Sequence, residues 1–227
     1  MIYIKEKIDK AEVAEMEVVT FGGRIIVIQT EAEAEKAVNY LLTNPIVGLD
    51  TETRPSFKRG TMNKVALLQV STYDTCFLFR LNMIGMCPPI VRLLSHPTLV
   101  KVGLSLKDDI RMLHHVGEFA NNNFIDLQDL VGQVGIRDMS LQKIYANLFG
   151  QKISKRQRLT NWEADVLNDA QKAYAAIDAW ACLKIYDRIE ELKALGGYEV
   201  IPVQVDESSS ESSKGGEPAI IMYDKAF

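Results

Sequence analysis

Short apolar runs separated by turn residues recur along the first half of the chain. Each run has the length of a strand and is rich in Val, Ile, Leu and Phe, which is typical of strands buried in a sheet. Two of these runs are separated only by Tyr73 and Asp74, which predicts a tight antiparallel hairpin. The runs predicted to form strands are 23–30, 46–52, 65–72, 75–81, 99–103 and 124–127.

Segments whose apolar residues are spaced three and four apart lie between and after these runs, and this spacing predicts helices. Thr30 is placed to cap the first of them. Hairpin-linked strands come first, and strands that alternate with helices follow. This order indicates an α/β fold of three layers, a mixed sheet with helices on both faces. The predicted helices are 31–42, 88–95, 107–116, 139–150 and 168–195.

The two ends of the chain differ from the central part. Residues 1–22 are expected to form a partly helical N-terminal arm, and residues 23–196 a single domain. Residues 197–227 are expected to form a flexible linker, rich in Ser, Glu and Gly over 206–218, and a short apolar tail. The tail is a candidate for docking a protein partner; docking on this domain or disorder is the favoured alternative.

Composition changes this picture little. The chain is 47% hydrophobic and 25% charged, as an ordinary globular protein is. No apolar stretch is long enough to span a bilayer, and the N-terminus is too charged for a secretory signal, so no membrane association is expected. Cys76, Cys87 and Cys182 lie far apart, which argues against a disulfide framework and a thiolate zinc site. We therefore expect a reducing compartment, the cytoplasm.

Candidate chemistry begins in the stretch IVGLDTE, where Asp50 and Glu52 follow an apolar run. Residues two apart on a strand point to the same face, so two like charges would lie side by side. Their burial requires a cation or a shared proton, and ligands that are all oxygen suit Mg²⁺ or Mn²⁺. The alternative is that the strand ends before Asp50 and both carboxylates are solvated.

Two later segments carry further acidic residues. In AYAAIDAWACLKIY, Tyr174 and Asp178 lie one helical turn apart on an otherwise apolar face. In VKVGLSLKDDIRML, Asp108 and Asp109 follow a short strand, where open α/β sheets build their sites. The alternatives are a structural Tyr–Asp hydrogen bond and two acids favoured by the dipole at a helix start.

Taken together, these motifs resemble the DEDDy class of 3′–5′ exonucleases: D-x-E on a strand, a later Asp on a helix, and Y-x-x-x-D on a C-terminal helix. The likeness runs from about Ile46 to Ile189. Within this class, the chain resembles the exonuclease domain of the Werner syndrome helicase and ribonuclease D. The related DEDDh class would have His where this chain has Ala173. The resemblance implies a ribonuclease H-like mixed sheet flanked by helices on both faces.

The resemblance also implies a set of catalytic residues. Asp50, Glu52, Asp109 and Asp178 would be the ligands of two Mg²⁺ or Mn²⁺ ions, with Asp109 chosen over its neighbour. Tyr174 would orient the attacking water or assist its deprotonation, and the orienting role is preferred. The implied reaction hydrolyses the terminal phosphodiester of a nucleic acid with a free 3′ end and releases nucleoside 5′-monophosphates.

Cationic residues near these motifs are candidates for binding the incoming strand, although a solvated loop is the alternative. The net charge of −4 does not exclude nucleic acid, because four carboxylates at one site account for much of it. Trp162 either stacks a base or, as favoured, packs in the core. The first basic group is Lys152, Lys155, Arg156 and Arg158, and the second is Lys58, Arg59 and Lys64.

Two other functions are compatible with the same fold. One is a catalytically silent domain that binds nucleic acid, although such domains usually lack a ligand that this chain retains. The other is a phosphohydrolase of small nucleotides, against which the first basic group counts. Likeness to the Werner exonuclease favours DNA as the substrate, whereas likeness to ribonuclease D favours structured RNA. We expect an exonuclease that prefers DNA.

Overall fold

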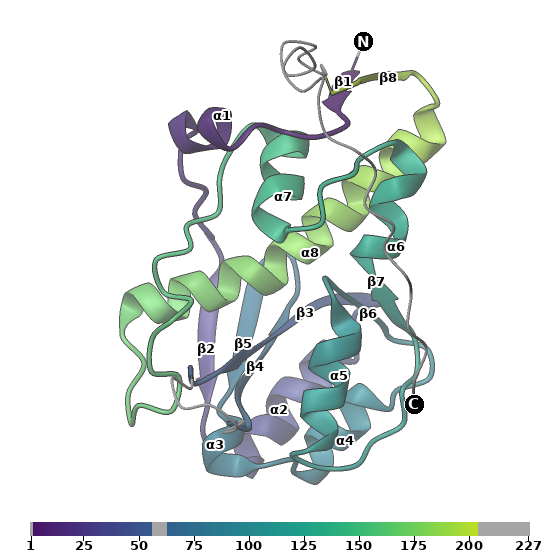
Figure 1. Cartoon of the computed structure of the whole chain (residues 1–227). Helices are drawn as coiled ribbons and strands as arrows, with labels where there is room; N and C mark the ends of the chain where they lie inside the picture. Colours follow the sequence, from purple (N-terminus) through teal and green to yellow (C-terminus); the bar gives the residue numbers. More distant parts are fainter. Residues whose placement is uncertain (1, 56–62, 204–227) are drawn as a thin grey trace, which may run out of the picture.

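A six-stranded mixed sheet forms the centre of the molecule, with strand order β2-β5-β4-β3-β6-β7 (Figure 1). The computed structural model describes residues 2–55 and 63–203. All six predicted strands are confirmed, close to their expected bounds. The strands are β2 (Arg24–Ile28), β3 (Ile46–Thr53), β4 (Val65–Ser71), β5 (Thr75–Phe79), β6 (Val100–Gly103) and β7 (Phe124–Asp126).

The pairing of β3 leaves room for a site at its end. β4 and β5 form the predicted hairpin, and β3 pairs antiparallel with β4 along most of its length. On its other side β3 pairs in parallel with β6, but only through Ile46–Gly48. The part of β3 that carries Asp50 and Glu52 therefore has an edge that β6 does not cover.

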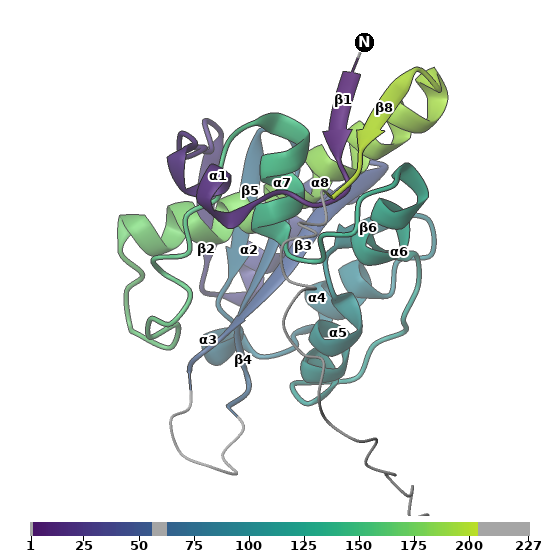
Figure 2. The same cartoon turned by 45° about the horizontal axis from the view of Figure 1, so that its top comes forward.

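Helices cover both faces of the sheet, as predicted (Figures 1 and 2). α8 (Asp169–Leu195) packs on one face with α6 (Leu127–Val131) beside it, and α7 (Leu141–Phe149) packs on α8. α2 (Glu31–Leu41), α4 (Pro88–Leu94) and α5 (Leu106–His114) pack on the other. The short helices are α1 (Lys10–Glu15), α3 (Leu81–Ile84) and η1 (Gly132–Val134). Among the described residues, no helix combines the length and apolar character needed to cross a bilayer.

Capping boxes fix where two of these helices begin. Thr30 caps α2 as predicted: its hydroxyl accepts from the amide of Glu33, whose carboxylate accepts in return from Thr30 (3.0 Å). Asn168 and Gln171 make the same exchange at the start of α8, at 2.9 and 3.1 Å. The start of α8 matters here because this helix carries Tyr174 and Asp178.

The structure corrects the prediction for the two ends. The N-terminal arm contains the helix α1, but it also contains β1 (Ile2–Lys5), which pairs in parallel with β8 (Tyr198–Ile201) (Figure 2). Residues 198–201 therefore belong to a strand and not to a flexible linker. Each strand is short, and its hydrogen-bonding partner lies at the other end of the chain, so no local pattern shows the pairing. The predicted Ser-rich segment and the apolar tail lie outside the described residues.

Candidate active site

The carboxylates of Asp50 and Glu52 project from β3 towards α8. Strand alternation places them on this face, while Val47 and Leu49 belong to the core beneath α2 and α4. The strand continues to Thr53, with an irregularity in its register after Glu52. Both side chains are thus held side by side on a paired strand, and the alternative of a strand that ends before Asp50 is wrong.

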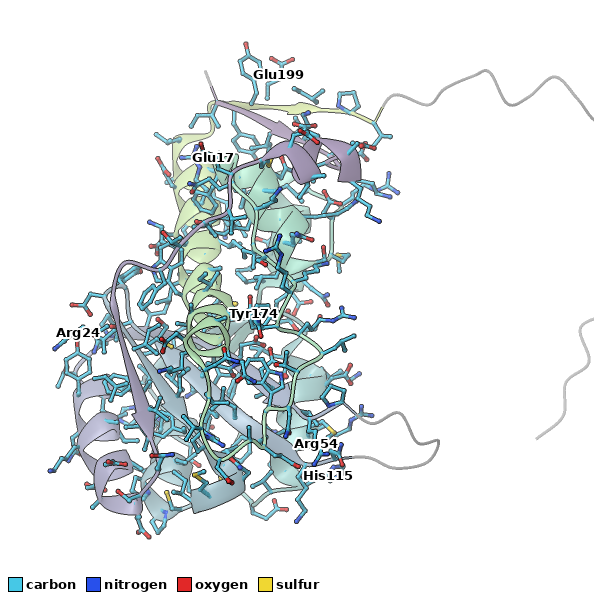
Figure 3. The ribbon with its side chains drawn as sticks, turned by 90° about the vertical axis from the view of Figure 1, so that its left-hand side faces the viewer. Glu17, Arg24, Arg54, His115, Tyr174 and Glu199 are labelled. Atoms are coloured by element: carbon cyan, nitrogen blue, oxygen red, sulfur yellow. The ribbon has the colours of Figure 1, made fainter. Side chains whose placement is uncertain are left out.

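Helix α8 brings a third carboxylate to the same place. Carboxylate oxygens of Asp50, Glu52 and Asp178 lie within 4.8 Å of one another, and we call these three residues the carboxylate cluster. Tyr174 lies one turn before Asp178 on α8 (Figure 3). Its hydroxyl donates a hydrogen bond to the carboxylate of Asp178. Asp178 is buried and Tyr174 partly buried. The structure therefore brings together both halves of the predicted site, from β3 and from α8.

Gly48 sets the distance between β3 and α8. A Cβ atom at this residue would lie 1.9 Å from the carbonyl oxygen of Ala179, far inside a normal contact. Ala179 directly follows Asp178 in the helix. The backbone of α8 can thus approach the sheet beside the carboxylate cluster only because residue 48 has no side chain.

We expect Gly48→Ala to push α8 away from the sheet and to separate Asp178 from Asp50. Overpacking of this kind costs about 1–3 kcal/mol of stability, and a displacement of about 1 Å can cost roughly 10² in rate. Both Tm and kcat should fall. Gly22→Ala is the control, because a Cβ atom there meets nothing within 4 Å. Equal activity of the two variants would contradict this account of Gly48.

Asp109 reaches the uncovered edge of β3 from helix α5. Its carboxylate accepts a hydrogen bond from the hydroxyl of Thr51, which lies between Asp50 and Glu52. The neighbouring side chain of Asp108 is 77% exposed and pairs with Arg111 at 3.0 Å. The structure thus turns Asp109, and not Asp108, towards the site, although Asp109 is not among the three residues of the carboxylate cluster.

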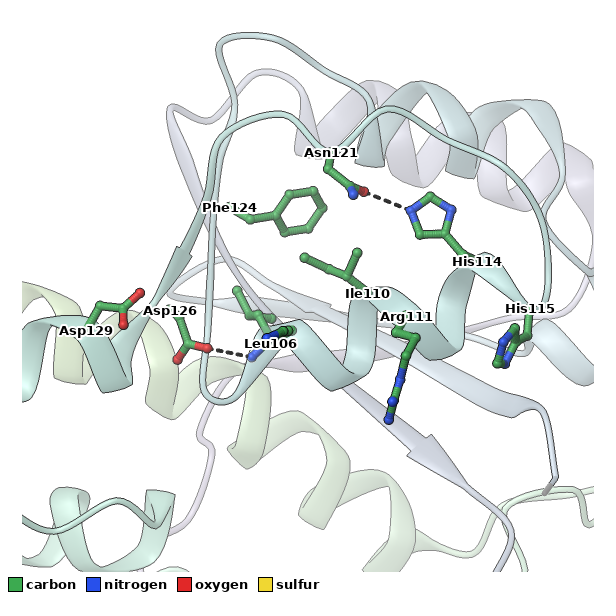
Figure 4. A pocket seen from close by; sticks show the side chains of 10 residues that line it. Leu106, Ile110, Arg111, His114, His115, Asn121, Phe124, Asp126 and Asp129 are labelled. Carbon is green, nitrogen blue, oxygen red and sulfur yellow. Dashed lines mark hydrogen bonds between the residues drawn. The ribbon is translucent and has the colours of Figure 1, made fainter. Parts of the chain in front are cut away.

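Asp126, at the end of β7, fixes the start of α5. Its two carboxylate oxygens accept hydrogen bonds from the amides of Ser105 (2.9 Å) and Leu106 (2.8 Å), the second of which is drawn in Figure 4. These bonds hold Ser105 in the left-handed region, with φ of 60°, which is uncommon for a residue other than glycine. The helix that carries Asp109 is thereby tied to the adjacent strand. Sequence reasoning gave Asp126 no role, although its place at the end of a predicted strand was a signal.

Burial raises the pKa of every carboxyl group at the site. The pKa of Asp50 lies well above its ordinary value because of burial and then because of the neighbouring charges of Asp178, Asp109 and Glu52. Burial is also the main cause that raises the pKa of Glu52 to about 9, of Asp178 to about 7 and of Asp109 to about 6. Without a bound cation, Glu52 therefore keeps its proton at neutral pH, and Asp178 is partly protonated there.

We expect the free energy of unfolding of EDTA-treated protein to fall as the pH rises from 5 to 8. The raised pKa values of Asp109, Asp178 and Glu52 lie above the values of about 4 in an unfolded chain. The folded protein thus binds more protons than the unfolded chain across this range. The stability that these groups contribute is complete below about pH 4. This stability is lost as the pH rises through the pKa values of these groups in the folded protein. The loss is about 1.4 kcal/mol per pH unit for each proton that the folded protein binds in excess of the unfolded chain.

Thermal melts at four pH values between 5 and 8 measure this slope. Asp178→Asn lacks one titrating group, so its slope should be shallower, and excess Mn²⁺ should restore stability at pH 8. Burial lowers the pKa of Lys101 to about 8, so this residue affects stability mainly above the tested range. A Tm that stays constant or rises from pH 5 to 8 in EDTA would contradict the raised pKa values.

A cavity of about 280 Å³ opens over the carboxylate cluster. Lys155 and Arg158 both line it. The positive charge of Lys155 lowers the pKa of Asp178, and that of Arg158 lowers the pKa of Glu52, so each opposes the effect of burial. Two residues of the first basic group thus face the site. Lining residues that sequence reasoning did not single out are Leu104, Ser105, Met139, Ser140, Leu141, Gln142, Ile153 and Cys182.

The other predicted nucleic-acid contacts do not line this cavity. The ammonium group of Lys152 donates to the carbonyl oxygen of Ala14, and Arg156 is exposed outside the cavity. Trp162 is fully buried, with its ring centroid 6.0 Å from that of Tyr174. A base cannot stack on a ring that the core covers on all sides. The packing alternative for Trp162 is therefore correct, and base stacking is wrong.

The second basic group is only partly described. Lys58 and Arg59 lie outside the described residues, and Lys64 lines a different cavity. Arg54, which is not in this group, directly follows β3 (Figure 3). It pairs with Glu163 at 3.2 Å and ties the end of the strand to the loop before α8. The described part of this group therefore gives no contact with the carboxylate cluster.

The donor set fits hard divalent cations. Carboxylate oxygens are the ligands that Mg²⁺ and Mn²⁺ prefer, and three carboxylates converge here. Within the part of the chain that the structure describes, no Lys or Arg forms an ion pair with any of the three. A bound cation would place positive charge directly between these carboxylates, which Lys155 and Arg158 approach without forming an ion pair.

Several known proteins are similar to this chain in sequence. A family model described as 3'-5' exonuclease matches residues 25–193. A 3'-5' exonuclease of Arabidopsis thaliana is 32% identical over 188 residues, which are 76% of this chain and 65% of that protein. The bifunctional 3'-5' exonuclease/ATP-dependent helicase WRN of Mus musculus is 28% identical over 153 residues, which are 65% of this chain and 11% of that protein.

A solved structure shows the same fold. RNase D of Escherichia coli matches with a TM-score of 0.68 at 24% identity, over 76% of this chain and 46% of that chain. This likeness confirms the expected ribonuclease H-like fold. The chain spans 65% or less of the length of each of the three proteins. Because the family model matches most of its length, the chain belongs to the 3'-5' exonuclease family.

Proposed function

We propose that this protein is a metal-dependent exonuclease that shortens nucleic acid from a free 3′ end and releases nucleoside 5′-monophosphates. The observation that carries this proposal is the carboxylate cluster, whose oxygens lie within 4.8 Å of one another beside Asp109 and Tyr174. The cavity above it is bordered by Lys155 and Arg158 and is open to a substrate. Acidic ligands, a phenol and phosphate-binding cations are the groups that phosphodiester hydrolysis needs.

Two Mg²⁺ or Mn²⁺ ions are the proposed cofactors. Asp50, Glu52 and Asp178 would hold them, and Asp109 would complete the ligand set from α5. When bound, such ions supply an activated water at neutral pH and stabilise the leaving 3′ oxygen. The carboxylates contribute the negative charge that holds the ions, and their fixed places on β3 and α8 set where the scissile phosphate can lie.

Tyr174 acts in this proposal as a hydrogen-bond donor and not as a base. Burial, followed by the charges of Asp178 and Glu52, holds the pKa of its phenol far above the ordinary value. The hydroxyl therefore keeps its proton and can orient the attacking water from its place beside Asp178. This supports the orienting role that was preferred for Tyr174.

We expect Lys155→Ala and Arg158→Ala to weaken the binding of oligonucleotides of any sequence, because phosphate contacts carry no sequence information. KM should rise, and the slope of log affinity against log salt should fall by about 0.7 for each contact removed from a single strand. Fluorescence anisotropy at several salt concentrations measures this slope. Lys36→Ala, on α2 at the opposite face of the sheet, is the control. An unchanged salt slope in both cavity variants would remove these residues from substrate binding.

The preferred substrate is DNA in this proposal. The resemblance to the Werner exonuclease supports DNA, whereas the solved RNase D is described as an exoribonuclease involved in structured RNA processing. DNA and RNA oligonucleotides of the same sequence, each labelled at the 5′ end and mixed in equal amounts, test this choice. Faster shortening of the DNA is expected. Faster shortening of the RNA would reverse the preference and leave the exonuclease activity standing.

The number of metal ions has a separate test. Calorimetric titration of Mn²⁺ into EDTA-treated and dialysed protein with a nonhydrolysable oligonucleotide should give two ions per chain. One ion per chain would contradict a two-metal mechanism. A cytoplasmic location and a protein partner for the C-terminal tail stay predictions.

A further inference from the structure

A buried glutamine without a hydrogen-bond partner lies in the sheet beside the carboxylate cluster. Gln69 of β4 is 0% exposed, and neither Nε2 nor Oε1 of its side chain has a partner among the described residues. Burying both polar atoms of an amide unpaired costs free energy that Met or Leu at this position would not incur. The amide therefore calls for a functional partner.

The strand register identifies the ionisable neighbour of this amide. Gln69 lies directly opposite Asp50 in the antiparallel pair of β3 and β4. Opposite side chains share a face of the sheet, with Cβ atoms about 4.5–5.5 Å apart. On the other side, β5 places the apolar Leu78 opposite Gln69. Ser71, two residues along β4, is already engaged, because its hydroxyl donates to the carbonyl oxygen of Thr72 at 2.7 Å. Among the strand neighbours of Gln69, Asp50 is thus the acceptor that remains free.

We propose that Gln69 is a positioning residue whose Nε2 donates a hydrogen bond to the Asp50 carboxylate when that carboxylate binds a divalent cation. This inference rests on the function proposed above. A carboxylate that binds a metal through one oxygen keeps a second oxygen free for a hydrogen bond, and that bond fixes its orientation. Removal of such a partner typically lowers metal affinity or activity by about 10–100-fold. Gln69 approaches Asp50 from the neighbouring strand, is fully buried and does not line the cavity, so it would hold the ligand without contacting the substrate.

The variant Gln69→Met tests this role, because methionine keeps the length and approximate volume of the side chain and lacks the amide. Mn²⁺ alone is titrated by calorimetry into metal-free wild type, Gln69→Met and the control Leu68→Met. Leu68 is the preceding residue of β4; it is fully buried and belongs to the core on the opposite face. We expect Gln69→Met to bind Mn²⁺ about 10–100-fold more weakly, and Leu68→Met to bind it as wild type does.

Two further measurements distinguish a residue that positions Asp50 from one that only packs in the sheet. The metal-free Gln69→Met protein should melt at or above the Tm of wild type, because an unpaired buried amide has been removed. Its kcat on a 5′-labelled oligonucleotide should fall while KM stays the same, because the residue does not contact the substrate.

Several results would overturn the role of Gln69. Equal Mn²⁺ affinity of Gln69→Met and wild type would remove the amide from the metal site. Loss of folding in both Gln69→Met and the second variant Gln69→Leu would assign the amide to the stability of the sheet. A wild-type protein that binds no Mn²⁺ would instead refute the proposed metal-dependent function, and this inference with it.

Discussion

Replacing Asp178 with Asn is expected to lower the exonuclease rate by about 10³-fold or more while the fold stays intact. The change is nearly isosteric and removes one of the three charges of the carboxylate cluster, which would help to hold the cations. Bound cations contribute several kcal/mol of transition-state stabilisation, and each loss of about 1.4 kcal/mol slows the reaction tenfold. Asp50→Asn should have the same effect. Single-turnover hydrolysis of a 5′-labelled oligonucleotide measures the loss.

The same variants should be more stable than wild type in EDTA at pH 8. Asn carries no charge, so it removes both the cost of burying an ionised carboxylate and the repulsion from its neighbours. Asp108→Asn is the matched control, since its side chain is 77% exposed and pairs with Arg111 outside the site. Wild-type activity is expected for it. If Asp178→Asn retained activity within tenfold of wild type, the carboxylate cluster would not be the catalytic centre.

Replacing Tyr174 with Phe is expected to slow hydrolysis by about 10²–10⁴-fold. The phenol is placed beside Asp178, and its high pKa keeps it a hydrogen-bond donor through the whole working pH range. Loss of the hydroxyl removes the donor that orients the attacking water, so kcat should fall and KM should stay unchanged. The pH–rate profiles of wild type and Tyr174→Phe from pH 6 to 10 should have the same shape, because Tyr174 does not titrate in this range.

Tyr186→Phe, the same change further along α8, is the control for general effects on the helix. It should retain wild-type kcat and Tm. An unchanged rate in Tyr174→Phe would exclude Tyr174 from the reaction. A rise in KM with constant kcat would move it from the chemical step to substrate binding.

Much of the fold and most of the site follow from local patterns. The sheet strands are short apolar runs, so composition and turn residues show them without tertiary information. Asp50 and Glu52 lie within one such run, and Tyr174 and Asp178 lie one turn apart on one helix. In each pair the backbone geometry alone fixes the relative direction of the two side chains. Local periodicity therefore predicts the two halves of the site, and the family resemblance joins them.

Other features depend on contacts between distant segments. The pairing of β1 with β8 joins the two ends of the chain. The selection of Asp109 depends on the direction of α5, which Asp126 fixes from the end of β7. For Trp162 the sequence left base stacking open beside the favoured packing, and only the tertiary structure shows that the core covers the ring. Gln69 reads as one polar position in a strand, and only the register places it opposite Asp50.

The most direct test of the central claim is a gel of one oligonucleotide, labelled at its 5′ end, incubated with Mg²⁺ and wild-type protein. Asp50→Asn protein and an excess of EDTA are run beside it. We expect products that shorten one nucleotide at a time from the 3′ end with wild type alone, and intact oligonucleotide in both other lanes. Intact DNA and RNA in every lane, or products that persist with Asp50→Asn or in EDTA, would contradict a metal-dependent exonuclease built on this site.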